Sequence, residues 1–416
     1  MQTSLLKTLL QTPAGLEADE ILRNCVHCGF CNATCPTYQL TGDELDGPRG
    51  RIYLIKQVLE GQQATRKTQQ HLDRCLTCRA CETTCPSGVD YHRLLDTGRD
   101  VVDRSVQRSP GDRLLRRALR MLLPWPARFG PLLRMGQRIR PLLPMTLQQR
   151  IPEKQHSSRT AAVYQHTRTM LLLDGCVQPS LAPQINNATL RVLDALGITA
   201  VSEKNSGCCG AVSHHLNATK EAKAFMCRNI DAWWPLIERG AEAIVITASG
   251  CAPMVKDYGR LLAADSAYAD KAKRVSALAK DISEVITAEF NRAAFADTGG
   301  DTRIAFHSPC TLQHGQRISG KVESILTQLG FKLTTVSNGH LCCGSAGTYS
   351  ILEPVLSSAL RNDKLATLQA GQPDIIATAN IGCLVHMASH AEVPVKHWIE
   401  LLEPLIREQG QIEKTP

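Results

Sequence analysis

The stretch Cys25-Val-His-Cys28-Gly-Phe-Cys31-Asn-Ala-Thr-Cys35-Pro36 decides how the first part of the chain folds. Each of its four cysteines has a counterpart 50 positions later, in Cys75-Leu-Thr-Cys78-Arg-Ala-Cys81-Glu-Thr-Thr-Cys85-Pro86. Both copies follow the spacing Cys-x2-Cys-x2-Cys-x3-Cys-Pro. A fixed internal period of this kind indicates a duplicated structural unit.

The spacing within each copy is typical of iron–sulfur ligands. Three cysteines two residues apart wrap one cluster in a single loop, whereas the fourth, followed by proline, ligates the other cluster in two-cluster ferredoxins. We therefore expect two [4Fe–4S] clusters, one held by Cys25, Cys28, Cys31 and Cys85, the other by Cys75, Cys78, Cys81 and Cys35. Zinc is the alternative, but a tetrahedral zinc site needs neither the third cysteine of each run nor the Cys-Pro pair.

A longer repeat occupies the C-terminal part of the chain. Cys176, Cys208 and Cys209 recur 134 positions later as Cys310, Cys342 and Cys343. One further cysteine follows in each copy, Cys251 in the first and Cys383 in the second. Short apolar runs at 170–173, 244–246, 304–306 and 375–376 alternate with helical patterns at 187–196 and 323–329. Strands that alternate with helices predict α/β units with parallel sheets.

The chain thus divides into four parts. We expect a mostly α-helical, ferredoxin-like two-cluster domain over 1–103, with helices at 15–24, 48–60 and 66–74. A basic, proline-containing linker with one helix at 112–123 spans 104–165. Two α/β domains follow, each with a Cys-Cys-Gly motif, over 166–300 and 301–416.

Composition and charge narrow the class of protein. Seventeen cysteines in 416 residues are too few for a disulfide scaffold, and the N-terminus lacks the apolar core of a secretory signal, so we expect a cytoplasmic protein. No apolar run is long enough to span a membrane. The net charge is +8, but residues 104–150 alone hold eleven arginines and one acidic residue, Asp112. This segment predicts either contact with an anionic membrane surface or a solvated helix at a domain junction, and no nucleic-acid motif accompanies it.

The sequence contains no motif for substrate chemistry. We find no dinucleotide fingerprint, no P-loop and no serine nucleophile elbow. An iron–sulfur cluster passes single electrons, so oxidation of an organic substrate must occur on a partner with a two-electron cofactor. We expect an electron-transfer subunit of an oxidoreductase, with no catalytic residue on this chain. A redox-sensing cluster protein is the alternative from another class.

The C-terminal repeat resembles the Cys-Cys-Gly domain family found in heterodisulfide reductases, where the domain holds iron–sulfur centres. The family pattern ends in Cys-x2-Cys, whereas the two copies here end with Met254 and His386. A third iron–sulfur or zinc centre therefore has two candidate donor sets, either Cys310, Cys342, Cys343, Cys383 and His386 or Cys176, Cys208, Cys209 and Cys251. The alternative is a duplicated fold that keeps its cysteines as small buried groups. Cys227 is expected in the core, and core or hydrogen-bonding roles are expected for His214, His215, His307 and His314.

The layout as a whole resembles the iron–sulfur subunits of 2-hydroxyacid and glycerol-3-phosphate dehydrogenases, and most of all the glycolate oxidase iron–sulfur subunits. The resemblance lies in the stretches 42–56, 71–78 and 341–349. It implies FAD-binding dehydrogenase subunits as partners, glycolate as the substrate that they oxidise to glyoxylate, and quinone or another membrane electron acceptor. It also implies peripheral association with the inner face of the cell membrane. Lactate or glycerol 3-phosphate are the alternative substrates.

Overall fold

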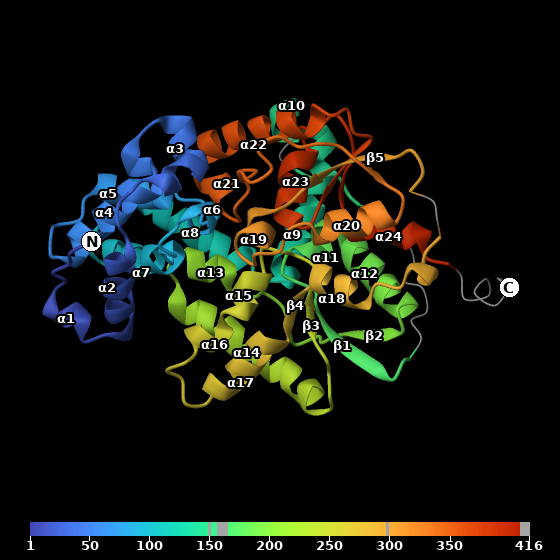
Figure 1. Ribbon diagram of the computed structural model, residues 1–416, viewed down its shortest axis with the longest axis horizontal. Helices are drawn as coiled ribbons and strands as arrows, with labels where there is room; N and C mark the ends of the chain where they lie inside the picture. Colours follow the sequence, from blue (N-terminus) through green and yellow to red (C-terminus); the bar gives the residue numbers. More distant parts are fainter. Residues whose placement is uncertain (149–150, 156–164, 297–298, 408–416) are drawn as a thin grey trace.

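The computed structural model describes residues 1–148, 151–155, 165–296 and 299–407. Its N-terminal domain is helical (Figure 1). The three helices predicted there are confirmed as α2, α4 and α5, and the boundary expected at residue 103 falls inside α7. Thr12 caps α2 and a Thr65–Thr68 capping box begins α5. The elements are α1 (Lys7–Leu10), α2 (Pro13–Asn24), η1 (Phe30–Thr34), α3 (Pro36–Thr41), η2 (Glu44–Asp46), α4 (Pro48–Leu59), α5 (Arg66–Asp73), α6 (Ala80–Thr84) and α7 (Tyr91–Ser105).

The basic linker contains more helix than the sequence predicted. Its described part forms α8 (Pro110–Leu122), α9 (Pro126–Ile139), η3 (Arg140–Leu142) and α10 (Met145–Gln148). Only the first of these was expected. Pro110 and Pro126 begin α8 and α9, at a position where the missing N–H has no helical partner to lose, and Pro131 lies inside α9. Much of the polar stretch at 153–160 lies outside the described residues.

Two four-stranded parallel sheets follow, and they confirm the predicted duplication of an α/β unit. The first sheet has the order β2-β1-β3-β4, and the second repeats it as β6-β5-β7-β8. The strands of the first sheet are β1 (Arg168–Leu173), β2 (Ile198–Ser202), β3 (Ile244–Ile246) and β4 (Ala279–Asp281). Those of the second are β5 (Arg303–His307), β6 (Lys332–Leu333), β7 (Ile375–Thr378) and β8 (Val395–His397).

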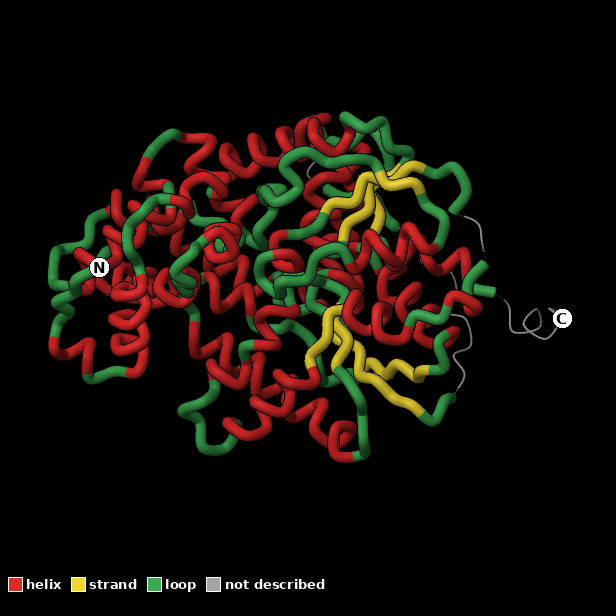
Figure 2. Tube along the Cα trace, viewed as in Figure 1, coloured by secondary structure: helices red, strands yellow, loops and turns green. Residues whose placement is uncertain are grey.

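The two sheets lie on the side of the molecule away from the N-terminus (Figure 2), and they share one apolar core. The helices that contribute to it include α12 (Pro183–Ala195), α18 (Ile282–Glu289), α20 (Lys321–Gln328) and α24 (Ile399–Leu402). Side chains alternate along β1, so that Met170 and Leu172 face this core while Leu171 and Leu173 face outward. The two copies therefore stabilise each other by burying a common surface.

Separate helices cover the outer face of each sheet. The first sheet is covered by α14 (Thr219–Glu238), α15 (Ala252–Lys256) and α17 (Ala269–Leu278), and the second by α22 (Pro354–Gln369) and α23 (Ile381–Ala388). None of the described helices has the length and apolar content needed to cross a bilayer. The remaining short elements are α11 (Gln178–Leu181), α13 (Ala211–His215), α16 (Tyr258–Leu261), η4 (Arg292–Ala294), α19 (Cys310–Gln313), α21 (Tyr349–Leu352) and η5 (Glu403–Leu405).

Candidate iron–sulfur sites

The two ferredoxin-type loops have the same backbone shape. Positive φ angles occur at the same two places in each loop, at His27 and Gly29 in the first and at Thr77 and Arg79 in the second. Thr77 stands 50 positions after His27, and Arg79 stands 50 positions after Gly29. Non-glycine residues rarely adopt this conformation, and it is concentrated at functional sites. The left-handed turns let each loop curl so that cysteines spaced by two residues face the same point.

The first group of thiols combines both motifs. Cys25, Cys28 and Cys31 line a cavity together with Cys85, which comes from the end of the second motif. Cys25 and Cys31 both interact electrostatically with Cys85. Burial, reinforced by these neighbouring thiols, raises the pKa of Cys31 to about 12. Such a crowded set of thiols ionises when an iron–sulfur core supplies compensating positive charge, so the donor set fits a thiolate-ligated cluster.

The second group of thiols mirrors the first. Cys78 and Cys81 interact electrostatically with Cys75 and with Cys35, which belongs to the first motif. Burial raises the pKa of both Cys78 and Cys81 well above the ordinary thiol value. The structure therefore exchanges the fourth cysteine between the two motifs, as the spacing predicts for two clusters. Whether iron–sulfur clusters occupy these groups stays a prediction.

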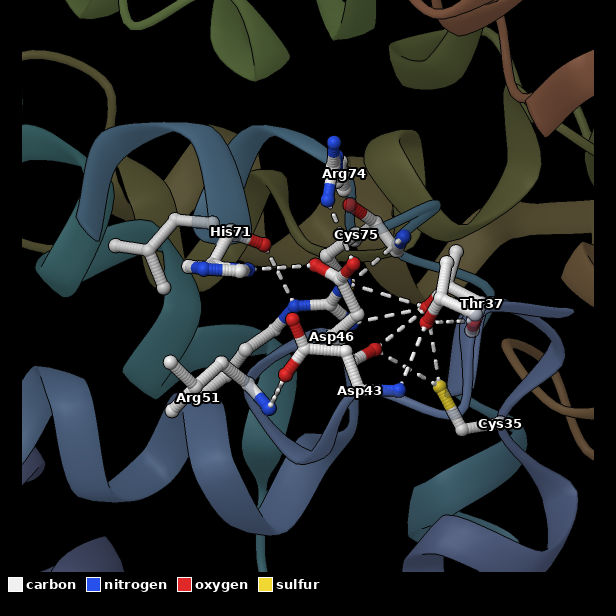
Figure 3. A network of polar contacts seen from close by, with 12 residues as sticks. Cys35, Thr37, Asp43, Asp46, Arg51, His71, Arg74 and Cys75 are labelled. Carbon is white, nitrogen blue, oxygen red and sulfur yellow. Dashed lines mark hydrogen bonds and ion pairs between the residues drawn. The ribbon is translucent and has the colours of Figure 1, made fainter. Parts of the chain in front are cut away.

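A polar network surrounds the second group (Figure 3). Tyr91 Oη lies 3.7 Å from Cys75 Sγ, the backbone N–H of Thr77 donates to the same sulfur at 3.4 Å, and the Thr37 hydroxyl lies 3.3 Å from Cys35 Sγ. Hydrogen bonds to cluster sulfurs are a main determinant of reduction potential. The second site therefore has a polar environment suited to an electron acceptor.

The second Cys-Cys-Gly copy gathers four buried thiols. Cys310 Sγ lies 3.8 Å from Cys342 Sγ, and Cys343 interacts with both Cys342 and Cys383. The hydrogen bond with Cys342 and burial together raise the pKa of Cys310. Gly344 has a φ of +84°, and a Cβ there would approach the Ser357 carbonyl oxygen to 2.5 Å, so only glycine fits the turn after the paired cysteines.

This copy adjoins the second ferredoxin-type group. Cys78 packs in one apolar cluster with Cys310, Cys342 and Tyr349. Cys78 also interacts electrostatically with both Cys310 and Cys342. His314 strengthens this junction, since its Nδ1 lies 2.8 Å from the Thr83 hydroxyl. No sequence pattern indicates this proximity, because more than 200 residues separate the two motifs.

The first Cys-Cys-Gly copy is chemically different. Cys208 and Cys209 are buried, whereas Cys176 and Cys251 are half-buried. Hydrogen bonds from Cys176 and Cys209 lower the pKa of Cys208 well below the ordinary thiol value. Cys227, expected in the core, is half-buried at the edge of the outer apolar cluster, because its position on α14 lies beside the helix stripe that faces the sheet.

The histidines divide into different roles. The sequence offers His386 as a candidate ligand. The distance between its Nε2 and the Ser357 hydroxyl oxygen is 3.2 Å. The histidine that stands with Cys343 and Cys383 is His307, for which the sequence predicts a core or hydrogen-bonding role. A signal for it is nevertheless present in the sequence, since it is the third residue before Cys310, at the end of a predicted strand.

Two protein-family models match the chain. Residues 21–89 match the 4Fe-4S dicluster domain, and residues 170–256 and 304–388 each match the cysteine-rich domain with the Cys-Cys-Gly motif. These matches cover both repeats that the sequence contains. The dicluster match implies two [4Fe–4S] clusters.

Curated relatives extend the similarity over the full chain. The glycolate oxidase iron–sulfur subunit of Escherichia coli (strain K12) is 54% identical over 98% of this chain and 100% of the relative. A probable glycolate oxidase iron–sulfur subunit of Bacillus subtilis (strain 168) is 30% identical over 88% of both chains. Lactate utilization protein A of Bacillus licheniformis is 25% identical over 55% of this chain and 95% of the relative.

Proposed function

The chain belongs to the family of glycolate oxidase iron–sulfur subunits, and we propose that it carries electrons from FAD-binding subunits that oxidise glycolate to glyoxylate toward a membrane acceptor such as quinone. The observation that carries this proposal is the pair of thiol groups whose fourth members are exchanged between the two motifs. Two clusters held by such groups within one small helical domain suit electron relay better than redox sensing.

We propose Cys25, Cys28, Cys31 and Cys85 as ligands of the first cluster and Cys75, Cys78, Cys81 and Cys35 as ligands of the second. Each [4Fe–4S] cluster, when bound, supplies a one-electron redox couple. The chain's own residues bury or half-bury most of the thiols and donate hydrogen bonds to sulfur. They perform no step on the organic substrate.

The surroundings of the two groups support an order of electron transfer. Cys28 is exposed, and the side chains of Val26 and Phe30 beside it are 68% and 63% exposed. The first site is therefore open to a docking partner, and we infer that electrons enter there. The second site is enclosed and rich in hydrogen-bond donors, and it adjoins the second Cys-Cys-Gly copy. Electrons then pass inward to the site whose environment favours the reduced state.

The helical linker supports peripheral membrane contact at the cytoplasmic face. Eight of its large apolar side chains are exposed, and exposed arginines lie among them. Apolar groups with arginines on one surface suit an anionic lipid leaflet. We infer that this surface, rather than a spanning helix, brings the chain to its acceptor. The apolar side chains are Leu114, Leu115, Met121, Leu132, Met135, Ile139, Leu142 and Met145.

Glycolate is favoured over lactate by the extent of similarity. The relatives named for glycolate oxidase cover 88% or more of this chain, whereas the lactate utilization protein of Bacillus licheniformis matches 55% of it. Copurification with flavin subunits that reduce a dye with glycolate, but not with lactate, supports the choice. Copurification with a lactate-specific flavoprotein would overturn it.

Replacement of Cys78 tests the relay directly. In the purified complex, Cys78→Ser should abolish glycolate-driven reduction of the natural acceptor, because the second cluster loses a thiolate ligand. Reduction of an artificial dye by the flavin subunits should be unchanged. Cys227→Ser is the matched control, since Cys227 lies outside all four motifs, and it should retain full activity. Unimpaired reduction of the natural acceptor by Cys78→Ser would contradict the relay.

A further inference from the structure

His307 has an unusual environment for a buried histidine. It ends β5, and only 2% of its surface is exposed. Its Nδ1 lies 2.9 Å from the Thr378 hydroxyl, whereas its Nε2 has no hydrogen-bond partner among the described residues. The ligand atoms of His307, Cys343 and Cys383 all lie within 4.8 Å of one another. A buried nitrogen without a partner is costly and requires an explanation.

The hydrogen bonding of His307 suits metal ligation. When Nδ1 carries the ring proton and donates it to the Thr378 hydroxyl, Nε2 keeps a lone pair that no described residue uses. Ligating histidines almost always donate their other ring N–H to a nearby acceptor, which fixes the tautomer and the ring orientation.

A buried lysine supplies positive charge at the same place. Lys364 is 3% exposed, and its Nζ donates to the Asn338 carbonyl oxygen at 2.8 Å. It interacts electrostatically with all four thiols of the second copy. Several thiolates in one buried pocket need compensating charge, and Lys364 provides part of it.

The first copy lacks both features. In the strand registers, Leu173 pairs with Ile246 in the first sheet just as His307 pairs with Thr378 in the second. Leu173 packs with Cys209 in the outer apolar cluster. Ile230, in the same cluster, stands 134 positions before Lys364. The two copies have therefore diverged. The first has the apolar side chains Leu173 and Ile230 at the positions where the second has His307 and Lys364.

We propose that His307 is a nitrogen ligand of a third iron–sulfur centre, which the second Cys-Cys-Gly copy holds with Cys310, Cys342, Cys343 and Cys383, and that the first copy holds no such centre. The contact between Cys78 and Cys310 puts the centre next to the second ferredoxin-type site, where a redox-inert metal would contribute nothing to relay. This inference rests on the proposed function and names the next site in its electron path.

The test uses the full chain, purified anaerobically, with its metal content and its EPR spectra as readouts. Wild type should contain about twelve iron atoms and twelve acid-labile sulfides, four for each of three centres. His307→Leu, which places the first copy's residue in the second, should contain about eight of each and no zinc. His386→Gln is the matched control and should keep about twelve.

Histidine labelled with ¹⁵N identifies the ligand itself. In pulsed EPR of the reduced wild type, a coordinated imidazole should give a strong nitrogen coupling that changes with the label. His307→Cys should keep about twelve iron atoms, because a thiolate replaces the nitrogen, and should lose that coupling. This variant also decides the question if His307→Leu fails to fold.

Several results would overturn the inference. These are about eight iron atoms in wild type, zinc in the pocket, an unchanged coupling in His307→Cys, or loss of iron in His386→Gln rather than in His307→Leu. The signals of the two ferredoxin-type clusters should persist in every variant. Their absence from wild type would instead overturn the proposed function.

Discussion

At the scale of single residues, Arg51 is a buried positive charge that interacts with the second group of thiols in the ferredoxin-type domain. Only 1% of its surface is exposed, and its guanidinium donates to the His71 carbonyl oxygen and the Thr37 hydroxyl (Figure 3). It interacts electrostatically with Cys75 and Cys35, two thiols of the second group. Asp46 lies 3.6 Å away but also pairs with Arg74, so the network keeps a net positive charge.

Arg51→Met should lower the reduction potential of the second cluster. A positive charge near a cluster favours its reduced state, and removal of a buried charge that interacts with the cluster's thiols shifts the potential on the order of 100 mV. The measurement is a redox titration in which EPR monitors the reduction of each cluster. Arg51→Lys, which keeps the charge, should shift the potential much less.

Arg104→Met, on the exposed surface, is the control for this titration and should leave both potentials unchanged. An equal shift of both clusters in Arg51→Met would contradict the assignment of Arg51 to the second site. Such a result would indicate a general change in the domain.

At the scale of secondary structure elements, α8 lies at a domain junction and also keeps exposed arginines. One face joins domains, since Arg116 pairs with Asp73 of α5 and Arg120 pairs with Glu221 of α14. Arg113 and Arg117 are exposed and stay available for an anionic surface. The exposed apolar side chains continue from α8 through α10, where Leu142 and Met145 are 85% and 74% exposed.

The double variant Arg113→Glu/Arg117→Glu should weaken binding to anionic vesicles. Each arginine near such a surface contributes about 1 kcal/mol, so loss of two should reduce binding at least about 25-fold. The measurement is co-sedimentation with vesicles that contain phosphatidylglycerol, with pure phosphatidylcholine vesicles as reference.

The apolar part of this surface is tested by Leu142→Glu/Met145→Glu, which should weaken binding to both kinds of vesicle. Val355→Glu is the matched control, because Val355 is 82% exposed on α22 and lies outside the linker. Equal binding by all variants would show that the linker does not contact lipid.

At the scale of the whole molecule, histidines tie the ferredoxin-type domain to both Cys-Cys-Gly copies. His214 Nε2 lies 3.0 Å from an Asp96 carboxylate oxygen, which joins α13 of the first copy to α7. His314 joins the second copy to α6 through Thr83. The contact between His214 and Asp96 raises the pKa of His214 and lowers the pKa of Asp96, although burial opposes both shifts. The domains are therefore held together by a contact that depends on pH.

His214→Gln should destabilise the protein more at pH 6 than at pH 9. A histidine whose folded pKa is raised contributes its full stabilisation below its unfolded pKa, and that contribution is lost as the pH rises through the folded pKa. Asp96 stays ionised throughout this range, because its folded pKa is lowered. We expect a loss of about 1–2 kcal/mol at pH 6.

The measurement is the difference in thermal midpoint between wild type and variant at pH 6, 7.5 and 9, at one scan rate. The difference should shrink as the pH rises. His390→Gln serves as control, since His390 is exposed and its ring hydrogen-bonds only to the neighbouring Ser389 in the described residues. A difference that is constant with pH would contradict the ion pair.

The sequence by itself determined the local features of this protein. Ligand spacing in Cys25–Cys35 and Cys75–Cys85, the apolar runs before Cys176 and Cys310, and the internal periods predicted the two-cluster domain and the duplicated parallel sheets. These features depend on neighbours in the chain, because loop conformation and strand periodicity are set over a few residues. The linker was the local failure, since Pro110 and Pro126 stand at first helical positions, where proline does not break a helix, and α9 also accommodates Pro131 in its interior.

Only the tertiary structure decided which distant residues meet. The shared core between the sheets, the contact of Cys78 with Cys310 and the position of His307 beside Cys343 all join segments far apart in sequence. No short-range pattern encodes such contacts. They follow from how complete modules pack to bury their apolar faces, and that packing depends on the shape of the whole molecule.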